Sequence, residues 1–300
     1  MLRPAWILGG LGIVALTAAT TACSSVQYFI ANAPTAFGSY ERRTNLKYGE
    51  GARLRLDIYK PKGDVADRPV VVFWYGGSWL RGDRAQYRFV GAALAQAGYV
   101  TVLPDYRLFP AVRFPAFLDD GARAVAWVQQ HAREFGGDPN RIVLMGHSAG
   151  AHMASFLAFN HEYLKRAGAK PEAIAGLVGL SGPYVLNPNS RVLHEIFASP
   201  YSIKDWQPAR FVDSTAPPTL LVHGTNDSVV SVAQTRELSE ALTRNNVHVE
   251  TEILDGRGHA DTVAAFSLVL RYRAPVLEET LQFIESVTSR NDPLRSPAPR

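Results

Sequence analysis

Residues 143–153 read VLMGHSAGAHM and join an apolar run typical of a β-strand to a pattern typical of a helix. Ser148 lies at the change, between Gly146 and Gly150. A tight strand-to-helix turn holds such a serine in strained backbone angles, with its hydroxyl exposed above the sheet edge. In this context the G-x-S-x-G motif predicts that Ser148 is a nucleophile. The alternative is a glycine-rich turn that serves only close packing of helix on strand.

A serine hydroxyl is a weak nucleophile and needs a neighbouring base. We predict that His259 is this base, because it lies in the glycine-rich loop DGRGHAD, directly after the last expected strand at 247–254. His147 adjoins the serine but is expected to point elsewhere. His152 and His223 are interpreted as structural histidines with satisfied hydrogen bonds.

The base in turn needs a carboxylate that orients it. Asp227 is the prediction, since it follows the expected strand TLLVHG at 219–224 and the chain order is then serine, aspartate, histidine. Asp255 and Asp261 share the loop of His259 and would have to fold back on it, so they rank below Asp227. The alternative is that Asp227 has only a structural role, in an Asx turn of a Thr-Asn-Asp loop.

Acyl transfer also requires N–H donors for the developing oxyanion. The stretch WYGGSW at 74–79 follows an apolar strand, and its glycines allow backbone N–H groups to turn toward the serine. We therefore predict an oxyanion hole made by the N–H groups of Gly76, Gly77 and Ser78, together with Ala149, the residue after the nucleophile.

Strand and helix patterns alternate along the chain. The runs at 70–75 and 99–104 are apolar on both faces, and 117–136 is amphipathic with helical spacing. This alternation predicts an α/β fold, with a mainly parallel sheet covered by helices on both faces and its chemistry at the carboxyl ends of the strands. Residues 181–217, rich in proline and aromatic residues, interrupt the alternation and are expected to form a small cap.

Composition limits the function classes. The chain has 300 residues, 47% of them hydrophobic, a formal net charge of +4 and one cysteine. Its basic residues are scattered, so a nucleic-acid partner is not expected. No H-E-x-x-H motif or cysteine cluster suggests a metal, and the expected chemistry needs no cofactor. With a single cysteine, no disulfide is expected.

The ends of the chain differ from its centre. Residues 1–23 are interpreted as an export leader, with Arg3 before about 15 apolar residues and small residues around Cys23. We further expect a linker at 24–42, a catalytic domain at 43–290 and a flexible tail at 291–300.

Three outcomes are open for this leader. It resembles a bacterial lipobox, which implies membrane attachment through a lipidated Cys23, but Thr20 stands where leucine is usual. Plain secretion and an uncleaved anchor are the alternatives. In each case the protein is exported, to the periplasm, to a membrane or out of the cell.

Several motifs together carry a family resemblance. YGGSW, PDYRLFP at 104–110, FPAFLDDGARAVAWV at 114–128, GHSAGAHMA and the pair HGTND and GHAD occur in this order. Over about 45–288 the chain resembles α/β-hydrolases of the esterase/lipase group, and it is similar to kynurenine formamidase-like and hormone-sensitive-lipase-like carboxylesterases. The resemblance implies a serine hydrolase that works through an acyl-enzyme and binds a small-molecule ester.

The resemblance also bears on individual residues. It implies that Asp105 and Arg107 of the DYR motif are structural ion-pair residues and not catalytic. Tyr75 stands where relatives usually have the histidine of a His-Gly-Gly loop. That histidine supports the loop, so we expect the tyrosine hydroxyl to do similar work.

Two other functions are compatible with the same residues. An amidase, formamidase or peptidase would use the same triad, although related peptidases usually carry a large extra domain. A binding protein on an inactive hydrolase fold is a second alternative, which the intact serine, aspartate and histidine disfavour. We favour an esterase because a single small cap leaves the site open to small acyl groups.

Overall fold

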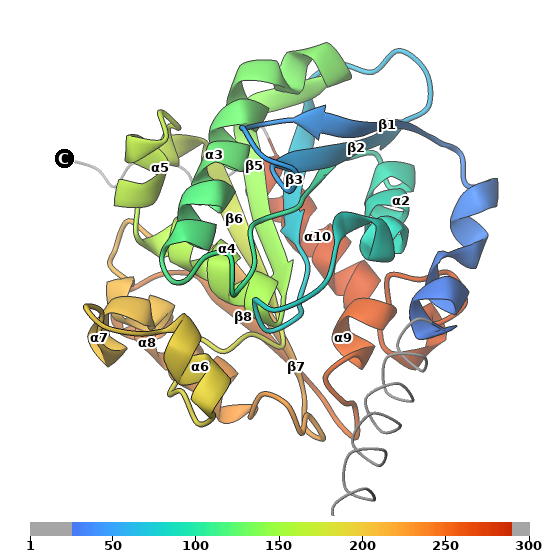
Figure 1. The fold of residues 1–300 in the computed structure, drawn as a ribbon. Helices are drawn as coiled ribbons and strands as arrows, with labels where there is room; N and C mark the ends of the chain where they lie inside the picture. The colour runs from blue at the N-terminus through green and yellow to red at the C-terminus, as the bar shows by residue number, and fades with distance from the viewer. Residues whose placement is uncertain (1–25, 290–300) are drawn as a thin grey trace, which may run out of the picture.

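The computed structural model describes residues 26–289, so the predictions for the leader at 1–23 and the tail at 291–300 lie outside it. One eight-stranded sheet has the order β1-β2-β4-β3-β5-β6-β7-β8 (Figure 1). Strands from β4 to β8 in this order run parallel, and β1 and β2 pair antiparallel at one edge. The strands are β1 Tyr40–Lys47, β2 Arg55–Pro61, β3 Arg68–Trp74, β4 Val100–Pro104, β5 Gly137–His147, β6 Ile174–Leu180, β7 Thr219–Gly224 and β8 Val249–Leu254.

Helices cover both faces of this sheet, which confirms the predicted α/β architecture (Figure 1). One face carries α3, α4 and α8, of which α4 packs on β3, β5 and β6; the other carries α2 and α10. Their bounds are α2 Arg88–Gln96, α3 Ala116–His131, α4 Ala149–Phe159, α8 Ala233–Arg244 and α10 Val276–Thr288. The shorter helices are α5 Glu162–Arg166, α6 Arg191–Ile196, α7 Ile203–Trp206 and α9 Asp261–Ala264.

The central strands are apolar on both faces because both faces are covered. Every residue of β4, β6 and β7 is buried, as are the last five residues of β3. Burial of this kind is the main favourable contribution to folding. The packed sheet also holds the carboxyl ends of its strands in place. The loops after β3, β5, β7 and β8 meet at this edge.

The segment expected as a linker is part of the folded structure. Residues 26–32 are helical, the 3₁₀ helix η1 Ala33–Phe37 continues them, and β1 begins at Tyr40. The carbonyl oxygen of buried Ala31 accepts a hydrogen bond from the Ser267 hydroxyl at 2.9 Å. Strand β1 shows no apolar alternation because it is an edge strand with mostly exposed side chains, held by its pairing with β2.

Strand β2 is more buried than the alternation of polar and apolar residues in its sequence suggests. Its pattern predicts one exposed face, but four consecutive residues, Leu56 to Tyr59, are buried. The polar member, Asp57, is accommodated because its carboxylate accepts a hydrogen bond from Arg84 Nε at 2.8 Å. A buried charge of this kind requires such a partner.

The expected cap occupies the predicted place between β6 and β7. It contains α6, α7 and the 3₁₀ helix η5 Pro208–Phe211. It is joined to the body by hydrogen bonds to its main chain, since Phe114 N donates to Ile196 O at 3.0 Å and the Arg113 side chain donates through Nη1 to Glu195 O at 2.7 Å. Within residues 26–289, none of the helices combines the length and the apolar character needed to cross a membrane.

Candidate active site

Ser148 lies on a strained turn between β5 and α4. Its backbone angles are φ +55° and ψ −122°, and its N–H group donates to Leu180 O at 2.9 Å. A non-glycine residue in such a conformation costs on the order of 1–3 kcal/mol and persists only where its surroundings hold it. The geometry matches the turn expected from residues 143–153.

The two glycines of the motif are required by close packing. A Cβ atom on Gly150 would lie 2.0 Å from the carbonyl oxygen of Trp74, and one on Gly146 would lie 2.2 Å from the carbonyl oxygen of Gly150. Helix α4 therefore approaches β3 at a distance that only glycine permits.

Replacing Gly150 should consequently destabilise the fold. We expect Gly150→Ala to lower the free energy of unfolding by about 3 kcal/mol, because the backbone on both sides must move. Urea unfolding measures this loss. Gly258→Ala is the control, since a Cβ there would meet nothing closer than 3.8 Å, and it should change the free energy by less than about 1 kcal/mol. Equal midpoints for the two variants would contradict the packing argument.

The predicted acid and base lie side by side. Asp227 follows β7 and His259 follows β8, and these strands are neighbours in the sheet. His259 Nδ1 lies 2.7 Å from Asp227 Oδ2. The two loops are also joined by their main chains, since Asn226 N donates to Arg257 O at 2.9 Å. The chain therefore brings two residues 32 positions apart into direct contact.

The Asp227 carboxylate is buried and fully bonded. Oδ1 accepts from Val229 N at 2.9 Å and Val230 N at 2.8 Å, while Oδ2 contacts His259 and lies 3.1 Å from His223 Nε2. Burial alone would raise the pKa of this carboxyl, but hydrogen bonds from His223, His259 and Val230 hold the pKa well below its usual range. Asp227 is therefore ionised when it contacts His259.

His223 is more than the structural histidine that we expected. Its Nε2 faces two acceptors, Val230 O at 2.9 Å and the Asp227 carboxylate, so this nitrogen must carry the proton. Its Nδ1 lies 2.8 Å from Thr235 Oγ1, which can donate to it. The one sequence signal was the spacing H-G-x-x-D, which puts this imidazole at the end of the strand that precedes the acid.

The expectation that His147 points away from the site is wrong. Its ring centroid lies 4.8 Å from that of His259, and its Nε2 donates to the carbonyl oxygen of His259 at 3.0 Å. Thr262 Oγ1 donates to the same oxygen at 3.2 Å. Burial, with the nearby His259, lowers the pKa of His147 to about 3. His147 is therefore a neutral donor that holds the backbone of the candidate base.

His152 connects three parts of the site. It is buried on α4, and its Nε2 donates to Trp206 O of the cap at 2.8 Å. Its ring contacts Trp79, from the loop after β3, and Phe197, from the cap, with centroids 5.1 and 5.7 Å away. Burial lowers its pKa to about 4. These contacts agree with a structural role.

Because the imidazoles of His147 and His152 are buried and neutral, we expect the protein to lose stability in acid. Because their folded-state pKa values lie below the ordinary value near 6.5, the unfolded chain binds protons that the native state does not as the pH falls from about 6.5 to 4. Each histidine should lower the free energy of unfolding by up to about 1.4 kcal/mol per pH unit in this window. In urea unfolding at several pH values, His152→Gln keeps an N–H donor and should remove one such contribution. An unchanged slope would refute this account.

The alternative carboxylates lie elsewhere. Asp255 accepts a hydrogen bond from Thr225 Oγ1 at 3.2 Å. Asp261 accepts from Gly258 N at 2.9 Å and from Arg273 Nη1 at 2.6 Å. Both therefore support their loops, and the carboxylate on His259 is that of Asp227.

The loop after β3 packs against the serine turn. A Cβ atom on Gly76 would lie 2.9 Å from the Cβ atom of Ser148. Gly77 has φ +138°, and a Cβ there would lie 2.1 Å from the carbonyl oxygen of Arg81. Ser78 also has a positive φ, of 55°. The chain thus makes a tight turn beside the nucleophile, as the glycines suggest.

The predicted oxyanion donors differ in their present partners. Among the residues that the structure describes, none accepts a hydrogen bond from the backbone N–H of Gly77, Ser78 or Ala149. The N–H of Gly76 is directed to the hydroxyl of Tyr87. Gly77, Ser78 and Ala149 therefore have N–H groups free for a bound substrate.

Tyr75 supports this loop through its hydroxyl. The hydroxyl accepts a hydrogen bond from Arg53 Nη2 at 2.7 Å, and the same nitrogen donates to Gly82 O at 2.7 Å. The carbonyl oxygen of Tyr75 accepts from the Tyr106 hydroxyl at 3.0 Å. Arg53 thereby ties the start of the loop to its end.

Asp105 and Arg107 take part in separate ion pairs. Arg107 binds the buried carboxylate of Asp120 through Nε and Nη2, at 2.8 and 2.7 Å. Asp105 accepts from Arg84 N at 2.8 Å and also pairs with the Arg84 guanidinium. Both ion pairs hold the structure together, as expected, but Asp105 and Arg107 do not pair with each other.

Comparison with known proteins identifies a matching family and several relatives. The family model BD-FAE matches residues 56–242. Esterase LipC of Mycobacterium tuberculosis is 30% identical over 277 residues, which cover 81% of this chain and 69% of the relative. Isoprenylcysteine alpha-carbonyl methylesterase ICME of Arabidopsis thaliana is 31% identical over 255 residues, covering 78% of this chain and 60% of the relative. The chain spans about half to three fifths of the length of several plant methylesterases that it matches.

Solved structures show the same fold. Esterase B from Lactobacillus rhamnosis superposes with a TM-score of 0.77 at 20% identity, over 94% of this chain and 96% of that one. An esterase of Thermogutta terrifontis superposes with a TM-score of 0.66 at 24% identity, over 82% and 92%. On the family match and the similarity to LipC, the chain belongs to the BD-FAE family and is an α/β-hydrolase related to serine esterases.

Proposed function

We propose that the protein hydrolyses carboxylic esters through an acyl-enzyme on Ser148. The observation that carries this proposal is the hydrogen bond of 2.7 Å between His259 and the buried Asp227, at the sheet edge where Ser148 stands on its strained turn. The esterase relatives support ester substrates.

The mechanism follows from the protonation states. Nδ1 of His259 donates a hydrogen bond to Asp227, which leaves Nε2 free to take the proton of the Ser148 hydroxyl. The serine Oγ then bonds to the ester carbonyl carbon, and the N–H groups of Gly77, Ser78 and Ala149 stabilise the oxyanion. Collapse of this intermediate expels the alcohol, which receives the proton from His259 Nε2. Water then attacks the acyl-enzyme by the same steps. His259 takes a proton from the water and returns it to Ser148 Oγ as the carboxylic acid leaves.

The test is hydrolysis of p-nitrophenyl esters from acetate to palmitate, with N-formyl and amide substrates in parallel. We expect turnover of the short-chain esters, since the cap between β6 and β7 is small. Turnover of formamides or amides alone would replace the ester proposal with the amidase alternative. No turnover of any substrate would favour a binding protein on a hydrolase fold.

We also propose that the protein is exported and attached to a membrane through a lipidated Cys23. Support comes from the sequence, which has Arg3, an apolar stretch of about 15 residues and Cys23 among small residues. Labelling of cells with a radioactive fatty acid would test lipidation, with Cys23→Ser as the unlabelled control. Export without labelling would leave plain secretion or an uncleaved anchor.

A further inference from the structure

Exposed apolar side chains gather in two short segments. Within residues 26–289, eleven large hydrophobic side chains are exposed, and seven of them belong to residues 26–37 and 268–272. Phe37 is 92% exposed and Tyr272 is 79% exposed. We call these seven the apolar face: Val26, Phe29, Ile30, Phe37, Leu268, Val269 and Tyr272. A concentration of this kind usually marks an interaction site.

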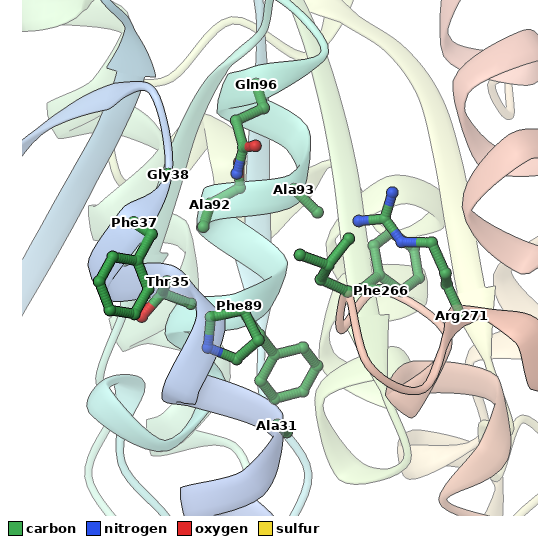
Figure 2. Close-up of a pocket in the computed structure, with 12 residues that line it drawn as sticks. Ala31, Thr35, Phe37, Gly38, Phe89, Ala92, Ala93, Gln96, Phe266 and Arg271 are labelled. Carbon is green, nitrogen blue, oxygen red and sulfur yellow. The ribbon is translucent and has the colours of Figure 1, made fainter.

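The two segments form one surface. The Ser267 hydroxyl donates to Ala31 O, and the segments line a common cavity of about 140 Å³. Figure 2 shows Phe37 on one side of this cavity, Phe266 and Arg271 on the other, α2 between them and Ala31 below. Residues far apart in the sequence therefore present their apolar side chains together.

Arginines border this face, together with Asp83 beside Phe29, and one of the arginines, Arg273, pairs with Asp261. Residues 26–40 contain no charged side chain, and residues 262–277 contain Arg271 and Arg273 but no carboxylate. A neighbouring groove lined by Phe29 also contains Arg42 and Arg88. Exposed apolar and aromatic side chains flanked by arginines suit the boundary between headgroups and acyl chains of an anionic membrane.

The sequence before residue 26 indicates that a membrane is close. Residues 5–19 are apolar, and only residues 20–25 separate them from the apolar face. Six residues span at most about 21 Å when fully extended. A bilayer that held residues 5–19 would therefore keep the apolar face within reach of its surface.

We propose that the apolar face docks on an anionic phospholipid bilayer, with its aromatic and aliphatic side chains among the headgroups and with Arg42, Arg88 and Arg271 on the phosphates. This docking is independent of the ester chemistry. It fixes the orientation of the folded domain on the membrane, beyond the attachment of the leader alone.

The test uses the full chain with Cys23→Ser and one new cysteine, labelled with the environment-sensitive dye NBD. Phe37→Cys and Tyr272→Cys place the dye on the apolar face, and Thr243→Cys places it on exposed α8 as the matched control. Each protein is mixed with vesicles of phosphatidylethanolamine and phosphatidylglycerol. We expect blue-shifted emission and quenching by brominated acyl chains at 37 and 272, but not at 243.

Three results would overturn the proposal. The dyes at 37 and 272 could fail to respond to lipid, whether or not the protein floats with the vesicles. All three dyes could respond equally, which would indicate unspecific adsorption. The dyes at 37 and 272 could respond without lipid and increasingly with protein concentration, in which case a second copy of the chain covers this face.

A second set of variants separates the face from the leader. Phe37→Ser combined with Leu268→Ser changes two exposed side chains and should leave the unfolding midpoint unchanged. Quenching at a Tyr272→Cys label should then fall severalfold, while flotation through residues 5–19 persists. Unchanged quenching would show that the leader alone brings residue 272 to the lipid, and would refute docking by the face.

Discussion

Ser148→Ala should lower kcat for p-nitrophenyl butyrate by at least about 10⁴-fold, with little change in KM. The substitution removes the oxygen that bonds to the acyl carbon and leaves the rest of the site in place. Only the oxyanion donors and substrate binding then remain, and these supply a small part of the rate enhancement. Alanine has the same Cβ atom as serine, so the backbone strain at φ +55° and the fold should be unchanged.

Steady-state kinetics with an active-site titrant would measure this loss, and Ser155→Ala is the matched control. Ser155 is buried on the same helix, and its hydroxyl has no hydrogen-bond partner among the described residues. Its removal should change kcat by less than about twofold, because no reacting group depends on it. Residual turnover above a few per cent in Ser148→Ala would remove the serine from the mechanism.

Asp227→Asn should lower kcat by about 10³- to 10⁴-fold, in the range found when a triad aspartate loses its charge. The structure gives a specific reason. The asparagine NH₂ group must replace either Oδ2, where it faces His223 and His259, or Oδ1, where it faces two main-chain N–H groups. Each choice sets donor against donor, so His259 should rotate or adopt the other tautomer.

Variants of the two other nearby carboxylates test this assignment. Asp255→Asn and Asp261→Asn remove the charges of the two other acids near His259. In the structure, Asp255 accepts a hydrogen bond from Thr225, and Asp261 accepts hydrogen bonds from Gly258 and Arg273. Both should retain kcat within about tenfold, since neither contacts a reacting group. A loss in Asp255→Asn as large as in Asp227→Asn would mean that the orienting acid has been assigned to the wrong strand.

The parts of the site that follow strands could be predicted from the sequence. Ser148 comes directly after β5, Asp227 and His259 lie in the loops that follow β7 and β8, and the carboxyl ends of parallel strands meet at one edge. Apolar runs reveal those strands, so the positions of the three residues follow from the pattern. Gly150 was equally visible, because the elbow needs a small residue where α4 meets β3.

Other features depend on tertiary contacts that a pattern does not contain. The orientation of His147 is set by the return of the His259 loop, whose carbonyl oxygen lies within reach of its ring. The contact of His223 with Asp227 depends on how tightly the acid loop turns. Strand β1 carries polar side chains, so its pairing with β2 gives it a place in the sheet that periodicity alone would not indicate.

The bonding of Asp227 has a consequence for where the proton resides during turnover. Its two oxygens already receive four donors, two from the main chain and two from imidazoles. A carboxylate offers about four acceptor sites, so none is vacant. A proton moving from His259 onto this carboxylate would have to displace an existing donor. The positive charge formed when Ser148 is deprotonated therefore stays on the imidazole of His259, and the aspartate acts as a fixed counter-charge.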